Sequence, residues 1–175
     1  MNAALRLSWY KFKHHYMDFV KVLLGIVAFE GLILYIQDKG FLKDFETTRM
    51  TLFLLLFSTS LLIVVQNSIY ISKERSVLNR DFFSGLSRSA FALASMGIHA
   101  FFAVLETIVF ILSYSVFSKF FDKEFPDAGH IFGSYRWEVG ITVLLVFLAS
   151  HFIALFISAL VGKSEITSVI LAVVV

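Results

Sequence analysis

The sequence predicts an all-α integral membrane protein, a polytopic bundle of helices that cross a lipid bilayer. Of its 175 residues, 58% are hydrophobic, and the mean hydropathy is +0.83, whereas a soluble globular domain is about 45–50% apolar. The apolar residues fall in long blocks separated by charged segments, not at the spacing of soluble amphipathic helices. The excess of apolar surface therefore requires a lipid solvent, and residues 1–175 are predicted to form one transmembrane domain.

The first segment, residues 1–20, predicts an amphipathic helix that lies at the membrane–water interface. Large apolar side chains recur at helical spacing from Leu5 to Leu23, and a second face carries Lys11, His14, Asp18 and Lys21. Such helices place aromatic rings at the acyl boundary and lysines near anionic headgroups. A soluble helix packed on a neighbour is the alternative. Because no compact apolar core precedes a small-residue cleavage site, we expect the segment to stay on the mature protein.

Four apolar stretches predict membrane spans, and they cover residues 21–37, 51–71, 90–117 and 139–161. The first stretch contains Glu30, and an acid at the centre of a span costs about 3 kcal/mol of insertion free energy. Its strongly apolar neighbours offset that cost. The last run, 166–175, is much shorter than the roughly 20 residues that cross a bilayer. We therefore expect the chain to stop inside a fifth span.

Loop charge predicts how the protein is oriented, because cytoplasmic segments carry an excess of Lys and Arg. With the N-terminus in the cytoplasm, the inside segments hold nine such residues: Arg6, Lys11, Lys13, Lys21, Lys73, Arg75, Arg80, Arg88 and Lys163. The outside segments hold six: Lys39, Lys43, Arg49, Lys119, Lys123 and Arg136. The sequence therefore predicts a multi-pass protein of the cell membrane, with its N-terminus and residues 72–89 in the cytoplasm.

Several function classes find no support in the sequence. A net charge of +2 and a pI of 8.9 give no nucleic-acid footprint. The absence of Cys excludes disulfides, thiolate metal sites and cysteine nucleophiles. His14 and His15 point about 100° apart on a helix and have no carboxylate cluster beside them, so no metal site is predicted. Neither G-x-S-x-G nor H-E-x-x-H occurs, and no catalytic residue is predicted.

The segment after the second span, ISKERSVLNRDFFSGLSRSAFALA, carries the most specific pattern in the chain. Its elements are Glu74-Arg75, Val77-Leu78, Arg80-Asp81, Gly85 and Phe91. With SYSVF ending the third span and the run ISALVGKSEITSVILA after the fourth, the chain resembles ABC-type export permeases of the type-2 class. The eukaryotic relatives in that class are the G-subfamily and pleiotropic-drug-resistance exporters. The sequence departs from the family pattern at Asp81, where Glu is usual, and at Ser87 and Phe91, where Tyr is usual.

The resemblance implies a mechanical role for residues 72–89. In the family this loop contains a short coupling helix that docks into the ATP-binding subunit and transmits its closure to the spans. The implied coupling residues are Glu74, Arg75, Val77, Leu78, Arg80, Asp81, Phe82, Phe83 and Gly85. Among them, the apolar side chains would anchor the helix in its partner, and the charged ones would pair locally.

The resemblance also implies partners. No phosphate loop of the form G-x-x-x-x-G-K-[ST] occurs, so this segment is not expected to bind a cofactor or hydrolyse ATP. ATP and Mg²⁺ are expected on a partner ATPase subunit or fused domain. A second permease half, in a homodimer or heterodimer, and the lipid bilayer are the other expected partners.

Ionisable residues inside the predicted spans are a second set of candidates: Glu30, His99, Glu106 and His151. His99 and Glu106 are seven residues apart and share a helix face. Such groups line a translocation path or proton relay, or they make hydrogen bonds between spans or between subunits. Two other functions stay open on these grounds. One is a proton-linked carrier or channel that uses these four residues, and the other is a membrane anchor or signalling subunit.

Overall fold

The computed structural model describes residues 2–37, 45–121, 131, 133–161 and 165–174, and within them the side chains of 2–15, 45, 72–76, 165, 166 and 168 are not described. The described chain is helical in the order α1 (Asn2–Ile36), α2 (Phe45–Ser68), α3 (Tyr70–Phe83), α4 (Arg88–Phe120), α5 (Tyr135–Leu160) and α6 (Glu165–Val174). No strand occurs in these ranges. The prediction of an all-α polytopic membrane bundle is confirmed.

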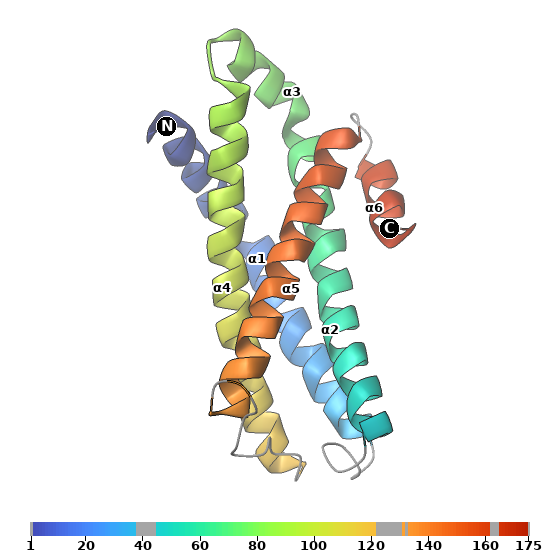
Figure 1. The fold of residues 1–175 in the computed structure, drawn as a ribbon. Coiled ribbons are helices and arrows are strands. Elements are labelled where there is room, and N and C mark those ends of the chain that lie inside the picture. Colours follow the sequence, from blue (N-terminus) through green and yellow to red (C-terminus); the bar gives the residue numbers. More distant parts are fainter. Residues whose placement is uncertain (1, 38–44, 122–130, 132, 162–164, 175) are drawn as a thin grey trace.

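The long helices alternate in direction along the bundle. Figure 1 shows the start of α1, all of α3, the start of α4 and the end of α5 at one end of the molecule, with the end of α1 and the start of α2 at the other. We call the first of these the α3 end. The packing partners are α1 with α4 and α2, and α5 with α2 and α4. Residues 72–89, which were predicted to be cytoplasmic, therefore lie at the α3 end.

Within the described residues, the helices long and apolar enough to cross a membrane include Tyr16–Ile36, Glu46–Ser68, Arg88–Phe120 and Tyr135–Leu160. They overlap the four predicted spans. An interfacial helix over residues 1–20 and a separate span over 21–37 were predicted for the first part of the chain. The structure has one uninterrupted helix there, α1. The interfacial face predicted for residues 1–20 lies mostly outside the described side chains.

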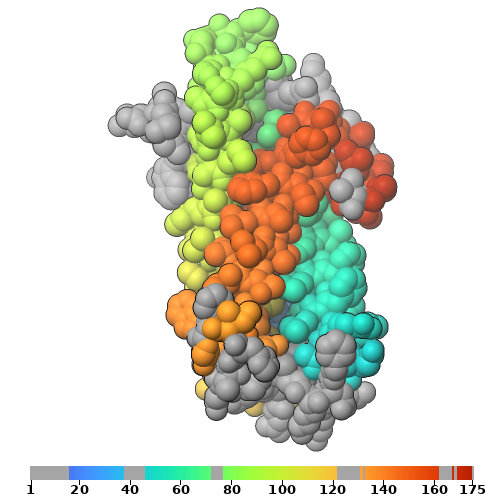
Figure 2. Space-filling model, in the orientation of Figure 1, coloured from blue at the N-terminus to red at the C-terminus, as the bar shows by residue number. Residues whose placement is uncertain are grey.

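The interior of the bundle is apolar and aromatic. A central cluster joins Ile26 and Leu34 of α1 to Phe110 of α4 and Phe147 of α5, and the last two rings meet edge to face with centroids 5.8 Å apart. Large apolar side chains also cover the outside of the helices, and Figure 2 shows α4, α5 and α2 side by side on one such face. An apolar exterior around an apolar interior is what a bilayer solvent permits.

The helix α4 is longer than the membrane is thick. Its 33 residues extend about 50 Å at 1.5 Å per residue, against a hydrocarbon core of about 30 Å. Figure 1 shows the end of α3 and the first turns of α4 projecting beyond the end of α5. The hairpin formed by α3 and the start of α4 therefore stands out from the rest of the bundle.

Candidate functional site

The predicted coupling segment is mostly helical, because α3 (Tyr70–Phe83) fills its first two thirds. The second span was predicted to end at Ile71. In the structure α2 ends at Ser68, and a turn at Ile69 separates it from α3. The backbone N–H of Ile71 donates to Ser158 Oγ of α5 at 2.8 Å. Since the first N–H groups of a helix lack partners within it, this bond ties the start of α3 to α5.

Gly85 ends α3 and turns the chain towards α4. Its φ of +100° lies in the left-handed region, which favours glycine. The N–H of Gly85 donates to the carbonyl of Phe82, and that of Leu86 donates to the carbonyl of Asp81, so the last carbonyls of α3 are satisfied. Ser87 then begins α4 by accepting a hydrogen bond from the N–H of Ala90 at 3.5 Å. The backbone conformation at this turn therefore explains why a glycine stands at position 85 of the predicted motif.

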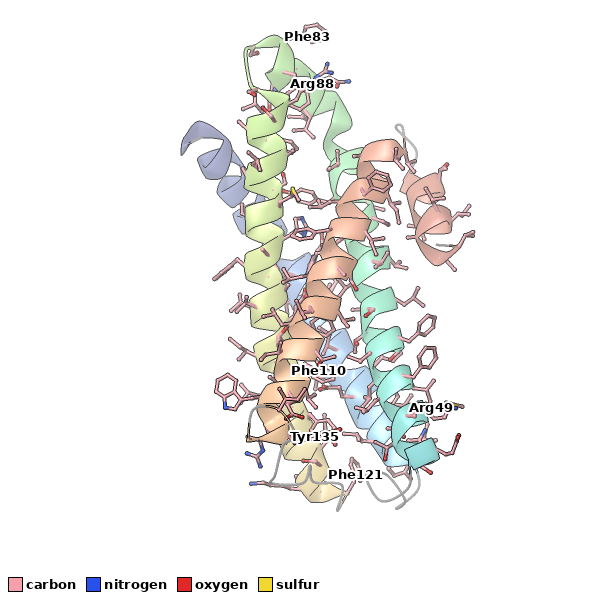
Figure 3. All side chains as sticks on the ribbon, viewed as in Figure 1. Arg49, Phe83, Arg88, Phe110, Phe121 and Tyr135 are labelled. Carbon is pink, nitrogen blue, oxygen red and sulfur yellow. The ribbon has the colours of Figure 1, made fainter. Side chains whose placement is uncertain are left out.

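The four predicted apolar anchors of α3 have different surroundings. Leu78 is only 2% exposed, so it packs inside the chain. Phe83 is 94% exposed, and Val77 is also exposed. Figure 3 shows Phe83 at the tip of the α3 end, pointing away from the bundle. Leu78 is thus buried within this chain, whereas Phe83 is open to a partner, and the anchoring role expected for both stays a prediction.

Phe82, the remaining predicted anchor, is half-buried and joins α3 to α4. Its ring meets Phe91 edge to face with centroids 6.0 Å apart, and the Arg88 guanidinium lies 5.6 Å from its centroid. Beside it is a groove of about 350 Å³, lined by Asn79, Phe82, Phe83, Leu86 and Arg88. We call this the hairpin groove. It combines apolar rings with an exposed guanidinium, which suits a partner with an apolar knob and an acidic rim.

Of the predicted charged coupling residues, Arg80 and Asp81 are described. Arg80 Nε lies 3.9 Å from Asp81 Oδ1, and the Arg80 side chain is largely exposed. A pair at this separation on the surface contributes little to stability. The side chains of Glu74 and Arg75 lie outside the described residues. The described cations at the tip, Arg80 and Arg88, thus remain accessible to a partner.

Three of the four ionisable residues predicted inside the spans come together in one buried chain. His151 Nε2 of α5 lies 2.8 Å from Glu106 Oε2 of α4, and His151 Nδ1 lies 3.0 Å from His99 Nδ1, also of α4. All three side chains are buried. The edge of the Tyr70 ring at the start of α3 also meets His99, with centroids 4.9 Å apart. We call Glu106, His151 and His99 the buried triad.

Glu30, the fourth of these residues, lies apart from the buried triad. Its Oε2 accepts a hydrogen bond from Ser113 Oγ and so links α1 to α4. Ser113 was not predicted from the sequence, although it stands seven residues after Glu106 and so shares its helix face. The buried face of α4 therefore makes polar contacts with α5 and with α1. Within the described residues, no group of three or more His, Asp or Glu side chains is placed to hold a metal ion.

The fold and this hairpin define a class: a multi-pass helical membrane domain that carries a short helix at the projecting end of a span pair. The family model described as ABC-2 type transporter matches residues 6–175. The chain therefore belongs to the ABC-2 type transporter family, and it is the membrane-spanning permease part of an ABC transporter. A permease of this family works with an ABC ATP-binding subunit. Searches of curated proteins and of solved structures each found no match.

Proposed function

We propose that this chain is an export permease whose α3–α4 hairpin docks into the ATP-binding partner and receives its movement. The observation that carries the proposal is the exposed Phe83 at the rim of the hairpin groove. An aromatic ring left in water at the tip of a projecting hairpin is typical of an interface anchor. The direction of transport and the likeness to the G-subfamily exporters rest on the sequence resemblance.

The path from the partner to the spans follows from contacts of α3. A force applied at Phe83 is transmitted along α3. This helix has a buried side chain at Leu78, and its Ile71 N–H is hydrogen-bonded to α5. The same helix carries Phe82, which contacts Arg88 and Phe91 of α4. Movement of α3 would thus displace both α4 and α5, because all of these contacts are direct. Helices packed this closely shift as units.

The proposal includes an orientation and a second subunit. The α3 end faces the cytoplasm of the cell, where ATP is available, and the N-terminus lies on the same side. Loop charge supports this, since Arg80 and Arg88 belong to the segments rich in Lys and Arg. Two permease halves, identical or different, would enclose the path for the substrate. ATP and Mg²⁺ would be bound by the partner.

The test compares two exposed phenylalanines at opposite ends of the bundle, one in α3 and one in α4. Phe83 lies at the α3 end, and Phe120, which is also highly exposed, ends α4 at the other. In proteoliposomes that hold the permease and its ATP-binding partner, Phe83→Ala should reduce their association about thirtyfold, since one interface anchor contributes roughly 2 kcal/mol. Permease-dependent ATP hydrolysis should fall with it. Phe120→Ala should change neither. Equal effects of the two substitutions, or no effect of Phe83→Ala, would contradict the proposed coupling.

A further inference from the structure

The buried triad is a continuous hydrogen-bonded chain with an unused polar atom at each end. Its order is Glu106, His151, His99, joined by the contacts of 2.8 and 3.0 Å. Glu106 Oε1 and His99 Nε2 are buried and have no hydrogen-bond partner among the described residues. Each unsatisfied buried polar atom costs stability, and these two atoms are the positions at which the chain of hydrogen bonds can take a further proton or partner.

Proton counting limits what the buried triad can hold. Each of its two contacts requires one hydrogen between the paired atoms, since two bare nitrogens or a bare nitrogen and a carboxylate repel. Two hydrogens are therefore the minimum. With that number, His151 Nε2–H donates to the Glu106 carboxylate and His99 Nδ1–H donates to His151 Nδ1. Both imidazoles are then neutral, and the triad carries one net negative charge.

A third hydrogen removes that charge without breaking either contact. It binds at an unused end atom, His99 Nε2 or Glu106 Oε1, and the triad becomes neutral overall. An uncompensated charge inside a membrane is costly. Among the described side chains no Lys or Arg is buried, so none of these cations is placed to compensate for the carboxylate. The third proton is what balances it.

We propose that the buried triad is a proton-binding site that takes up and releases one exchangeable proton, in addition to the part the chain plays as a permease. Transfer through it is balanced. A proton that binds His99 Nε2 lets the Nδ1 hydrogen pass to His151 Nδ1, and the Nε2 hydrogen of His151 then passes to Glu106. One proton has moved from one end of the triad to the other, about two turns of α4.

Among the side chains that the structure describes, few other titratable groups lie near the triad. From α3, Tyr70 presents its ring edge to His99. From α1, Glu30 lies towards the other end of the bundle on Ser113, and Asp18 pairs with Lys21 at 2.9 Å on an exposed face. On α2 the buried polar side chains are Thr51, Thr59 and Ser68, which do not titrate. The exchangeable charge therefore belongs to the triad itself.

The test is ¹⁵N NMR of histidine-labelled protein in lipid vesicles. The chain has five histidines, and the variant with His14→Gln, His15→Gln and His130→Gln keeps only the two of the triad. Between about pH 9 and pH 5, which brackets the range where histidine titrates, the ¹⁵N shifts should show one proton taken up per chain. A ¹³C shift of the Glu106 carboxyl, recorded over the same range, reports a proton bound at that end of the triad. Two rings that keep neutral tautomers and a Glu106 carboxyl that keeps one shift throughout would together overturn the proposal. This measurement needs no ATP-binding partner, so its outcome is independent of the proposed coupling.

Glu106→Gln provides the decisive comparison. The amide oxygen still accepts from His151 Nε2–H, but the triad with two hydrogens is then neutral and has no charge to balance. The uptake of the third proton should be lost over the same pH range, or moved at least tenfold in proton concentration. Glu46→Gln, at an exposed pair with Arg49, should leave it unchanged. Identical titrations of the Glu106→Gln and unsubstituted chains would overturn the proposal, and the unsubstituted titration alone decides it if Glu106→Gln does not fold.

Discussion

Leu78 and Phe83 lie five residues apart on α3, yet Leu78 is 2% exposed and Phe83 is 94% exposed. The Leu78 side chain is buried within this chain, and the Phe83 side chain is free to contact a partner at the tip of the hairpin. Substitutions at the two positions should therefore act on different properties of the protein.

Leu78→Ala should lower the free energy of unfolding by about 2–4 kcal/mol, because it removes a buried side chain and leaves a cavity. Phe83→Ala should change that free energy by less than about 0.5 kcal/mol, since an exposed ring has little to lose. Unfolding by SDS, followed by circular dichroism, measures both. A stable Leu78→Ala variant would show that α3 does not depend on this contact.

The orientation of the protein can be measured because the chain contains no Cys. Single cysteines at Ser84, at the α3 end, and at Glu46, at the start of α2, both occupy exposed positions. In intact cells a membrane-impermeant maleimide should label Glu46→Cys and leave Ser84→Cys unlabelled until the membrane is opened. Labelling of Ser84→Cys from outside would place the α3 end away from the cytoplasm.

Ser113→Ala should loosen the contact between α1 and α4, because it leaves the buried Glu30 carboxyl without that donor. Hydrogen bonds between membrane helices contribute roughly 0.6 kcal/mol on average and up to about 1.7, so a loss of about 1 kcal/mol is expected. The matched control is Ser115→Ala, whose hydroxyl bonds only to the carbonyl of Ile111 in its own helix. The two variants should differ in SDS unfolding, and equal stability would contradict the proposed link between the helices.

Gly31 lets α1 approach α4 closely. A Cβ at this position would lie 3.1 Å from Cζ of Phe117, whereas one at Gly97 would meet nothing within 4 Å. Gly31→Val should therefore cost about 1–3 kcal/mol through overpacking against a rigid ring. Gly97→Val, on an exposed face of α4, should be nearly neutral. Comparable losses at both positions would mean that valine acts through the helix backbone and not through contact with Phe117.

The fold class and the approximate spans could be predicted from the amino-acid sequence. Long apolar blocks require lipid, and a block of about 20 residues specifies a helix across it, because a helix satisfies all of its backbone hydrogen bonds within one segment of that length. The short helix within residues 72–89 was expected from the resemblance to the family's first cytoplasmic loop, and the structure has α3 there.

Which face of each helix packs against its neighbours depends on the packing of the whole bundle. Helical spacing placed His99 and Glu106 on one side of α4, but only the packing of α5 against it brought His151 between them. Glu30 is equally buried, yet it contacts α4 at Ser113, seven residues after Glu106 and so outside the triad. Leu78 and Phe83 read alike as apolar anchors in the sequence. Interior and exterior positions of a membrane bundle are both apolar, so hydropathy cannot tell them apart. Only the contacts between helices show which positions face the interior.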